Sequence, residues 1–230
     1  MRTGRGVIAA GRAVAMGVLV LIGVVSCDTP PPQTKPASTL VYVALGAAGS
    51  DYVVRIRDAL QGPTRTIDLI DLRAADGAID AVNDALLPLL LAGRQPRLVT
   101  LWAGADDLLA GRDVVDFESG LSVALERLHN NTTALVVVGT MPDGIGIPGT
   151  IRTQPESLTP QRVRAFNEAV TRQASLHGAV LVDLSGVTIA AKLVTTTDGA
   201  HLSAEGGDVV AAQFLAAIQP RLPAPPKPLK

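Results

Sequence analysis

The segment 41-VYVALGAAGSDYVVRIRDAL-60 passes from an apolar run through a Gly/Ser-containing turn into a helical pattern. Its first five residues read as a strand buried on both faces of a parallel sheet. From Asp51 onward, apolar residues recur at helical spacing. A strand that runs directly into a helix is the first half of a βα unit, so this segment predicts an α/β fold.

The same alternation continues along the chain. After a first strand at 40–45, further strands are expected at 66–72, 98–102, 134–140 and 180–183. Helices are expected at 51–60, 78–91, 117–129, 160–177 and 204–218. Right-handed crossovers join parallel strands of one sheet, so the pattern predicts an open parallel sheet. In such a sheet, functional residues follow the carboxyl ends of the strands.

Composition narrows the class of protein. The chain has 230 residues, of which 47% are hydrophobic, which suits one domain with a sizeable core. Without Arg2, Arg5 and Arg12 of the first segment, acidic residues outnumber basic ones by four, which argues against a nucleic-acid surface. The single cysteine, Cys27, excludes an internal disulfide and a multi-cysteine metal site. No metal or cofactor is expected.

The N-terminus has the pattern of an export signal. A basic stretch precedes the apolar run AVAMGVLVLIGVVS, which is shorter than the roughly 20 residues that span a bilayer. The run ends in VVSC, which resembles the lipobox of bacterial lipoproteins and implies lipidation at Cys27. An uncleaved anchor helix is the alternative. Either interpretation predicts an extracytoplasmic protein held at the cell membrane.

The resulting organisation has four parts. These are a signal peptide at 1–26, a Pro-rich tether at 27–38, a folded domain at 39–220 and a Pro-rich tail at 221–230.

Two blocks carry a family resemblance. They are 98-LVTLWAGADDLLAG-111 and 196-TTDGAHLSAEGG-207. Together they resemble the SGNH (GDSL-type) hydrolases, which include serine esterases, lipases and carbohydrate deacetylases. The resemblance implies a three-layer α/β/α, flavodoxin-like fold with a five-stranded parallel sheet. It also implies a small ester or an acetylated glycan as the ligand.

The terminal part of the family's chemistry is intact. In this family, a Ser after the first strand attacks the acyl carbon, and a His acts as its base, oriented by an Asp three residues earlier. By this resemblance, Asp198 is the orienting acid and His201 is the base. A surface turn with a capping Asp and a solvated His is the structural alternative.

The oxyanion-stabilising part is altered. The family uses the Ser amide, a Gly amide after the second strand and an Asn side chain after the third. Here Gly104 is kept, but Asp106 replaces the Asn, and an ionised Asp accepts hydrogen bonds and repels an oxyanion. The Gly corresponds to Ala74 if 76-DGAID-80 opens the next helix, or to Ile70 in a shifted register. Only Ala74 leaves room for activity.

The nucleophile's place holds Ala48, whose amide would be an oxyanion donor but which has no hydroxyl. Ser50 follows two residues later. It is either the N-cap of the next helix, with Asp51 in the first turn, or a displaced nucleophile near His201.

Other candidates have structural interpretations. We expect Ser203 to cap the last helix and Trp102 to pack in the core. His129 and His177 lie at helix C-termini, where a cation suits the helix dipole.

Two hypotheses therefore follow from the sequence. The first is a catalytically impaired or noncatalytic relative that binds a ligand or partner. The second is an active serine ester hydrolase that uses Ser50, Asp198 and His201.

Overall fold

The computed structural model describes residues 38–48, 50–75, 77–142, 159–187 and 202–223. All of them belong to one compact unit, residues 34–230. None of the helices in the described ranges is long and apolar enough to cross a membrane.

Five parallel strands form one sheet in the order β2-β1-β3-β4-β5. They are β1 (Ser38–Gly46), β2 (Arg65–Asp71), β3 (Leu98–Trp102), β4 (Leu135–Gly139) and β5 (Val180–Val182). Every neighbouring pair is parallel, which confirms the predicted sheet.

Six helices connect the strands or follow them. They are α1 (Tyr52–Leu60), α2 (Ile79–Leu91), α3 (Ala105–Leu109), α4 (Val114–Asn131), α5 (Pro160–Leu176) and α6 (Ala204–Ile218). The short helix α3 was not expected, and α4 begins three residues before the predicted start. A five-residue helix is too short to show helical periodicity in the sequence.

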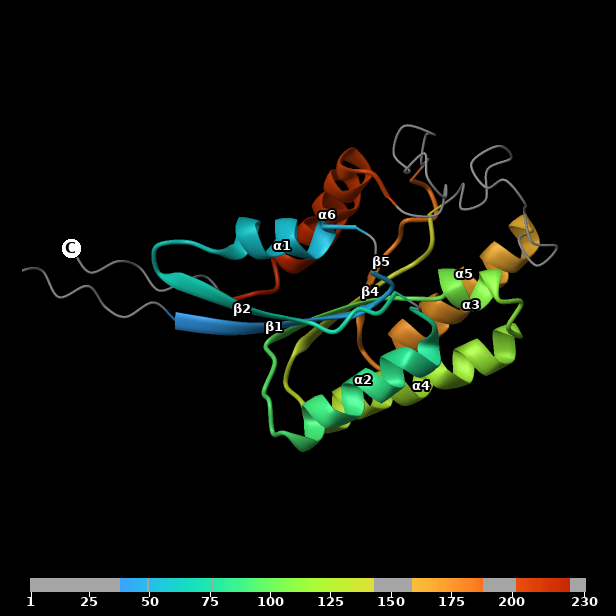
Figure 1. Cartoon of the computed structure of the whole chain (residues 1–230), viewed down its shortest axis with the longest axis horizontal. Coiled ribbons are helices and arrows are strands. Elements are labelled where there is room, and N and C mark those ends of the chain that lie inside the picture. Colours follow the sequence, from blue (N-terminus) through green and yellow to red (C-terminus); the bar gives the residue numbers. More distant parts are fainter. Residues whose placement is uncertain (1–37, 49, 76, 143–158, 188–201, 224–230) are drawn as a thin grey trace, which may run out of the picture. The chain divides into compact units, whose positions relative to one another are not determined.

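Helices cover both faces of the sheet (Figure 1). Alternate residues of β1 show why: Tyr42 and Ala44 are buried in the core with α1 and α6. Val43 and Leu45 point to the other face and are buried with α2, α4 and α5. This arrangement confirms the three-layer α/β/α fold, and it brings the loops after the strands to one edge of the sheet.

Candidate active site at the carboxyl edge of the sheet

The first strand ends in a turn that only glycine fits. Gly46 has a φ of 113°, and a Cβ atom there would lie 1.9 Å from the carbonyl oxygen of Trp102. The next amide, that of Ala47, donates to the same carbonyl at 3.1 Å. The chain therefore leaves β1 while still attached to the end of β3.

The amides of Ala48 and Ala74 are both engaged with backbone. Ala48 N–H donates to the carbonyl of Ala74 at 2.7 Å, and Ala74 N–H donates to the carbonyl of Gly46 at 3.1 Å. Ala47 and Ala74 form an isolated parallel bridge beyond the last paired residues of β1 and β2. The two amides expected at an oxyanion hole are thus donors within an extension of the sheet.

Another glycine in this region, Gly77, packs against the turn that follows β1. Gly77 is buried, and a Cβ atom on it would lie 2.3 Å from the Cα atom of Ala47. Ala74 lies three residues earlier, and Ile70 is inside β2, packed against the core. Which residue takes the place of the family's glycine stays a prediction.

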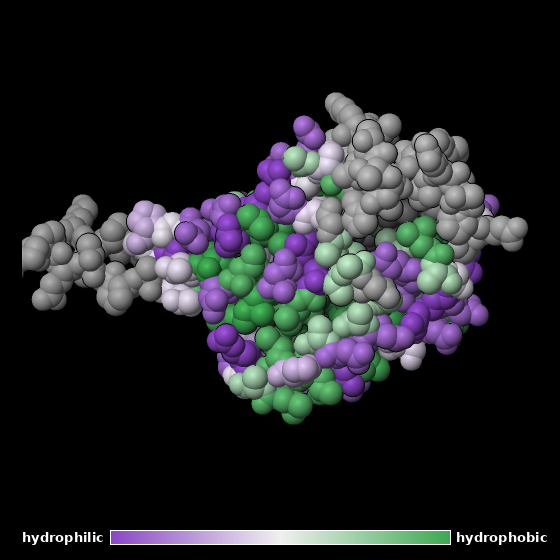
Figure 2. Space-filling view, in the orientation of Figure 1, coloured by the Kyte–Doolittle hydropathy of each residue, from purple (hydrophilic) through white to green (hydrophobic). Residues whose placement is uncertain are grey.

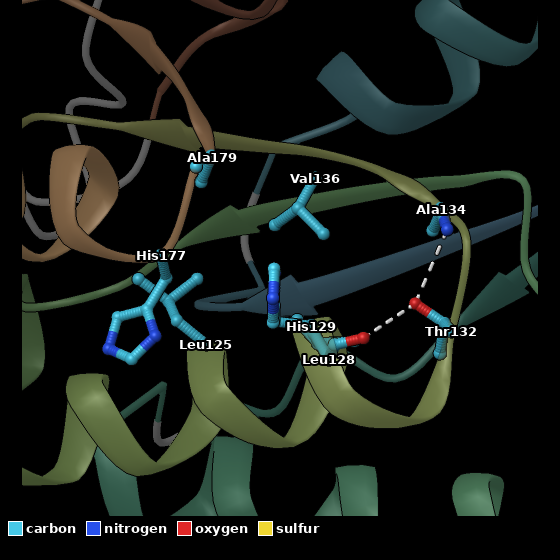
Figure 3. A pocket seen from close by; sticks show the side chains of 9 residues that line it. Leu125, Leu128, His129, Thr132, Ala134, Val136, His177 and Ala179 are labelled. Carbon is cyan, nitrogen blue, oxygen red and sulfur yellow. Dashed lines mark hydrogen bonds between the residues drawn. The ribbon is translucent and has the colours of Figure 1, made fainter.

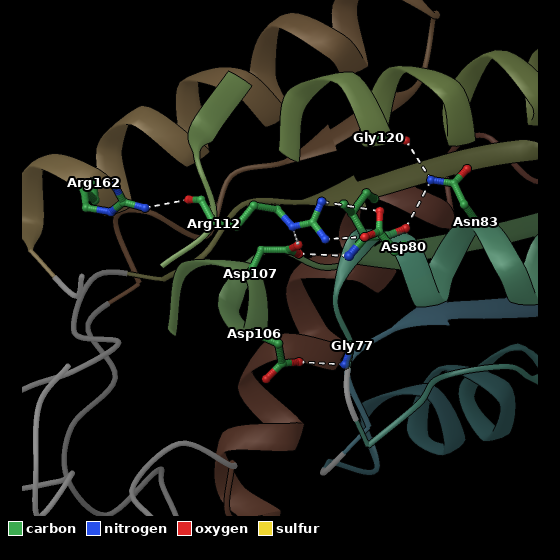
Figure 4. Close-up of polar contacts among 9 residues, drawn as sticks. Gly77, Asp80, Asn83, Asp106, Asp107, Arg112, Gly120 and Arg162 are labelled. Atoms are coloured by element: carbon green, nitrogen blue, oxygen red, sulfur yellow. Dashed lines mark hydrogen bonds and ion pairs between the residues drawn. The ribbon is translucent and has the colours of Figure 1, made fainter. Parts of the chain in front are cut away.

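The Asp106 carboxylate accepts a hydrogen bond from the amide of Gly77. Gly77 N–H donates to Asp106 Oδ2 at 2.8 Å, and the Asp106 side chain lies in the first turn of α3 (Figure 4). The family resemblance implies an asparagine donor at the position of Asp106. Here the side chain at that position accepts a hydrogen bond from a backbone amide instead.

Asp107, the next residue, has a structural role. Its side chain is fully buried, accepts from Ile79 N–H at 2.9 Å and pairs with Arg112 Nε at 2.8 Å. Arg112 also pairs with Asp80 on α2 (Figure 4). Burial raises the pKa of Asp107 to about 6. This carboxylate lies on α3 and caps the first turn of α2, so it connects the two helices.

Ser50 lies in the loop before α1 and does not cap that helix. The N-cap residue is Asp51, without a side-chain capping bond, so the expectation that Ser50 caps α1 is wrong. The Ser50 carbonyl accepts from Arg73 Nη1 at 2.7 Å. The Ser50 hydroxyl forms no hydrogen bond to another residue of the described ranges.

Arg73, two residues after the end of β2, fixes this loop. Its guanidinium makes two hydrogen bonds to the Asp71 carboxylate, at 2.9 and 2.8 Å, and lies 5.2 Å from the ring centre of Tyr52. The Arg73 side chain is only 7% exposed. Paired and shielded in this way, it holds the backbone of Ser50 in one place.

Comparison with known proteins identifies the family. The model of the GDSL-like lipase/acylhydrolase family matches residues 40–209. The chain belongs to this family. No curated protein sequence matches it significantly.

Solved structures of GDSL-like and carbohydrate esterases share the fold. The acetyl xylan esterase AlAXEase has a TM-score of 0.62 at 19% identity, over 78% of this chain and 100% of its own. A Clostridium thermocellum family 3 carbohydrate esterase has 0.62 at 16%, over 80% and 96%. The lipase/acylhydrolase from Enterococcus faecalis has 0.60 at 18%, over 82% and 98%.

The family's terminal block, Asp198 and His201, lies outside the described residues. The residues that follow it are described: Ser203 caps α6 and accepts from Gly206 N–H at 3.2 Å, as expected. A Cβ atom on Gly207 would lie 3.8 Å from the amide nitrogen of Tyr52. The first turn of α6 is therefore held beside the start of α1, next to the loop of Ser50.

The ends of β4 and β5 keep a complete polar framework in this GDSL-like domain. The buried Asn167 side chain accepts from Met141 N–H and donates to Met141 C=O, both at 2.8 Å. Thr140 Oγ1 accepts from Leu184 N–H at 2.7 Å and lies 3.2 Å from Asp183 Oδ1. These side chains fix the backbone immediately after the fourth and fifth strands, at Met141 and Leu184.

Trp102, at the end of β3, contacts both the end of β4 and the start of α1. Its indole N–H donates to the carbonyl of Thr140 at 3.0 Å, and its ring meets Tyr52 edge-on with centres 5.4 Å apart. The packing role expected for Trp102 is confirmed.

The two described histidines face a different part of the domain. A pocket of about 170 Å³ lies at the amino end of the sheet, and His129 and His177 line it with Ala134 and Ala179 (Figure 3). His177 Nε2 lies 3.1 Å from Ser122 Oγ. Both histidines end helices, as expected, at the edge of the sheet opposite the candidate site.

Proposed function

We propose that this protein is a membrane-tethered lipoprotein with a GDSL-like hydrolase domain that binds a ligand or partner and is noncatalytic or strongly impaired as an esterase. The observation that carries the proposal is the hydrogen bond from Gly77 N–H to Asp106. It supports an ionised, hydrogen-bond-accepting carboxylate at the position where the family resemblance implies an asparagine donor. A negative charge there opposes the oxyanion of ester hydrolysis.

The other parts of the altered site support the same conclusion. Ala48 has no hydroxyl, and its amide already donates to Ala74. Loss of a single oxyanion donor typically lowers the rate roughly a hundredfold to a thousandfold. Because catalytic groups act as a unit, loss of the nucleophile leaves little rate for the remaining groups to support.

The ligand class that we propose is a small ester or an acetylated glycan. Two structural neighbours are named as an acetyl xylan esterase and a family 3 carbohydrate esterase. The proposed tether places this ligand outside the cytoplasm, at the membrane surface. Mass spectrometry of the N-terminal peptide tests the anchor: a diacylated Cys27 supports it, and an unmodified chain retaining residues 1–26 contradicts it.

The catalytic part of the proposal is tested with the full chain. We expect no turnover of short-chain p-nitrophenyl esters above the Ser50→Ala variant and no labelling by a fluorophosphonate. Titration with acetylated xylo-oligosaccharides, followed by NMR shifts of residues near Asp106, tests binding. Labelling at Ser50 that disappears in Ser50→Ala and in His201→Ala, with folding unchanged, would overturn the noncatalytic proposal.

A second candidate function rests on one observation. Because Asp51 is the N-cap of α1, the hydroxyl of Ser50 is not used to begin that helix. This favours Ser50 as a displaced nucleophile, with His201 as its base and Asp198 as the orienting acid. The same labelling experiment decides between the two functions.

A further inference from the structure

The amino edge of the sheet carries the largest exposed apolar side chains of the second and fifth helices. Leu87 is 45% exposed and Leu91 is 79% exposed, both near the end of α2. Leu176, at the end of α5, is 72% exposed. A green, apolar area extends from the middle of β1 and β2 to the end of α2 (Figure 2).

Basic residues accompany this apolar surface. Residues 85–97 contain five leucines, two arginines and no acidic residue. The arginines, Arg94 and Arg97, are exposed in the connection between α2 and β3. Arg97 is placed at the amino edge because its amide donates to the carbonyl of Val41 at 2.9 Å. The surface formed by Leu87, Leu91, Arg94 and Arg97 is called the amino-edge patch below.

The chain enters the domain at the same edge. β1 starts at Ser38 and pairs with β3 only from Tyr42 onward, so its first four residues project about 13 Å beyond β3. Cys27 precedes Ser38 by eleven residues, a length that reaches about 40 Å at most. A lipid on Cys27 therefore keeps this edge within reach of the bilayer surface.

We propose that the amino-edge patch contacts the anionic surface of the membrane to which the protein is tethered. This inference rests on the lipid anchor of the proposed function. Exposed leucines next to arginines suit such a surface, since apolar side chains enter the headgroup region and each arginine pairs with anionic lipid. The contact turns the opposite, carboxyl edge of the sheet, with Asp106 and Ser50, away from the bilayer.

The test uses the lipidated full chain in vesicles of phosphatidylcholine, with and without 30% phosphatidylglycerol (about one lipid in three). Flotation of the chain with the vesicles reports the anchor. Hydrogen exchange of residues 87–97 reports the patch, and exchange of residues 105–115 at the carboxyl edge is the internal reference. Each arginine near an anionic surface strengthens the contact about fivefold.

We therefore expect exchange of residues 87–97 to slow about tenfold in the anionic vesicles, with residues 105–115 unchanged. The Arg94→Glu/Arg97→Glu and Leu91→Ser variants should lose this protection while still floating. Arg164→Glu and Val115→Ser, at exposed positions of the carboxyl edge, are the matched controls and should keep it.

Three results would overturn the inference. One is a chain that floats but whose residues 87–97 exchange equally fast with neutral and anionic vesicles. This result would refute the patch contact and leave the lipid anchor supported. Another is protection that depends on protein concentration without vesicles, which would assign the patch to a second copy of the chain. The third is a chain that does not float and shows no salt-sensitive protection by anionic vesicles, which would overturn the anchor as well.

Discussion

The two halves of the carboxyl edge differ in how their polar groups are satisfied. At the ends of β4 and β5, Asn167 and Thr140 hold neighbouring backbone in place, as a framework does. At the ends of β1, β2 and β3, the polar groups near the expected site are bonded to each other. Gly77 donates to Asp106, and Ala48 donates to Ala74.

This difference agrees with the proposed loss of catalysis. An unsatisfied buried donor costs about 1–3 kcal/mol, so an enzyme's empty oxyanion hole is held at some expense of stability. This loss of stability is avoided at Gly77 and Ala48, because both amides have acceptors within the protein. The framework half is still required, since it fixes the backbone at the ends of β4 and β5 whether or not the site is catalytic.

The largest expected effect comes from reversing the altered half. Ala48→Ser/Asp106→Asn restores a hydroxyl and a side-chain donor, and we expect at least about a hundredfold more fluorophosphonate labelling than in the wild type. Initial labelling rates with the full chain measure it. Adding His201→Ala should return the rate to baseline. A folded double variant as unreactive as the wild type would show that the remaining amide bridge alone silences the site.

The next effect belongs to the framework half. Asn167→Ala leaves both Met141 N–H and Met141 C=O without their partner, and should lower the free energy of unfolding by about 3–4 kcal/mol. Denaturant unfolding measures it. Asn131→Ala, which removes an exposed bond to the carbonyl of Arg127, is the control and should cost less than about 1 kcal/mol. Equal losses would contradict the distinction between the two halves.

Two carboxylates should give the halves opposite pH dependence. Burial raises the pKa of Asp107 to about 6, from 3.8, so the folded protein keeps this proton to higher pH than the unfolded chain. The free energy of unfolding should therefore fall between about pH 4 and pH 6, by at most about 3 kcal/mol. Asp107→Asn should lack this fall in urea unfolding measured across the range.

Asp183 in the framework half has the opposite sign. The hydrogen bond from the Ser185 hydroxyl lowers the pKa of Asp183, so its contribution is present above pH 4 and is lost as the pH falls further. Asp183→Asn should weaken only the fall in the free energy of unfolding below about pH 4. An unchanged slope between pH 4 and pH 6 in Asp107→Asn would contradict the assignment to Asp107.

The smallest expected effect separates two serines. Ser203→Ala removes the cap of α6 and should cost about 1 kcal/mol of unfolding free energy. Ser50→Ala should cost less than half of that, because Ser50 does not cap α1. Thermal and denaturant unfolding of both variants measure the difference. A loss for Ser50→Ala as large as for Ser203→Ala would show that Ser50 stabilises the loop.

Much of the fold could be predicted because its signals are local. The five strands and the long helices follow from apolar runs and helical spacing, and the cap at Ser203 follows from its place before α6. The helix α3 was missed because five residues hold little more than one turn. The role of Gly77 was missed because its contact is with Ala47, thirty residues away and on another strand's loop.

The sequence by itself determined the α/β alternation and the family blocks, and it led to the prediction that Ala48 and Asp106 stand in the places of the nucleophile and the Asn. Residue identity and periodicity are local properties, and they can be read from neighbouring residues alone. Only the tertiary structure decided that the Gly77 amide meets Asp106 and that the amides of Ala48 and Ala74 are already engaged. Those partners come from separate strand ends, and a hydrogen bond between them exists only once the sheet has brought the ends together.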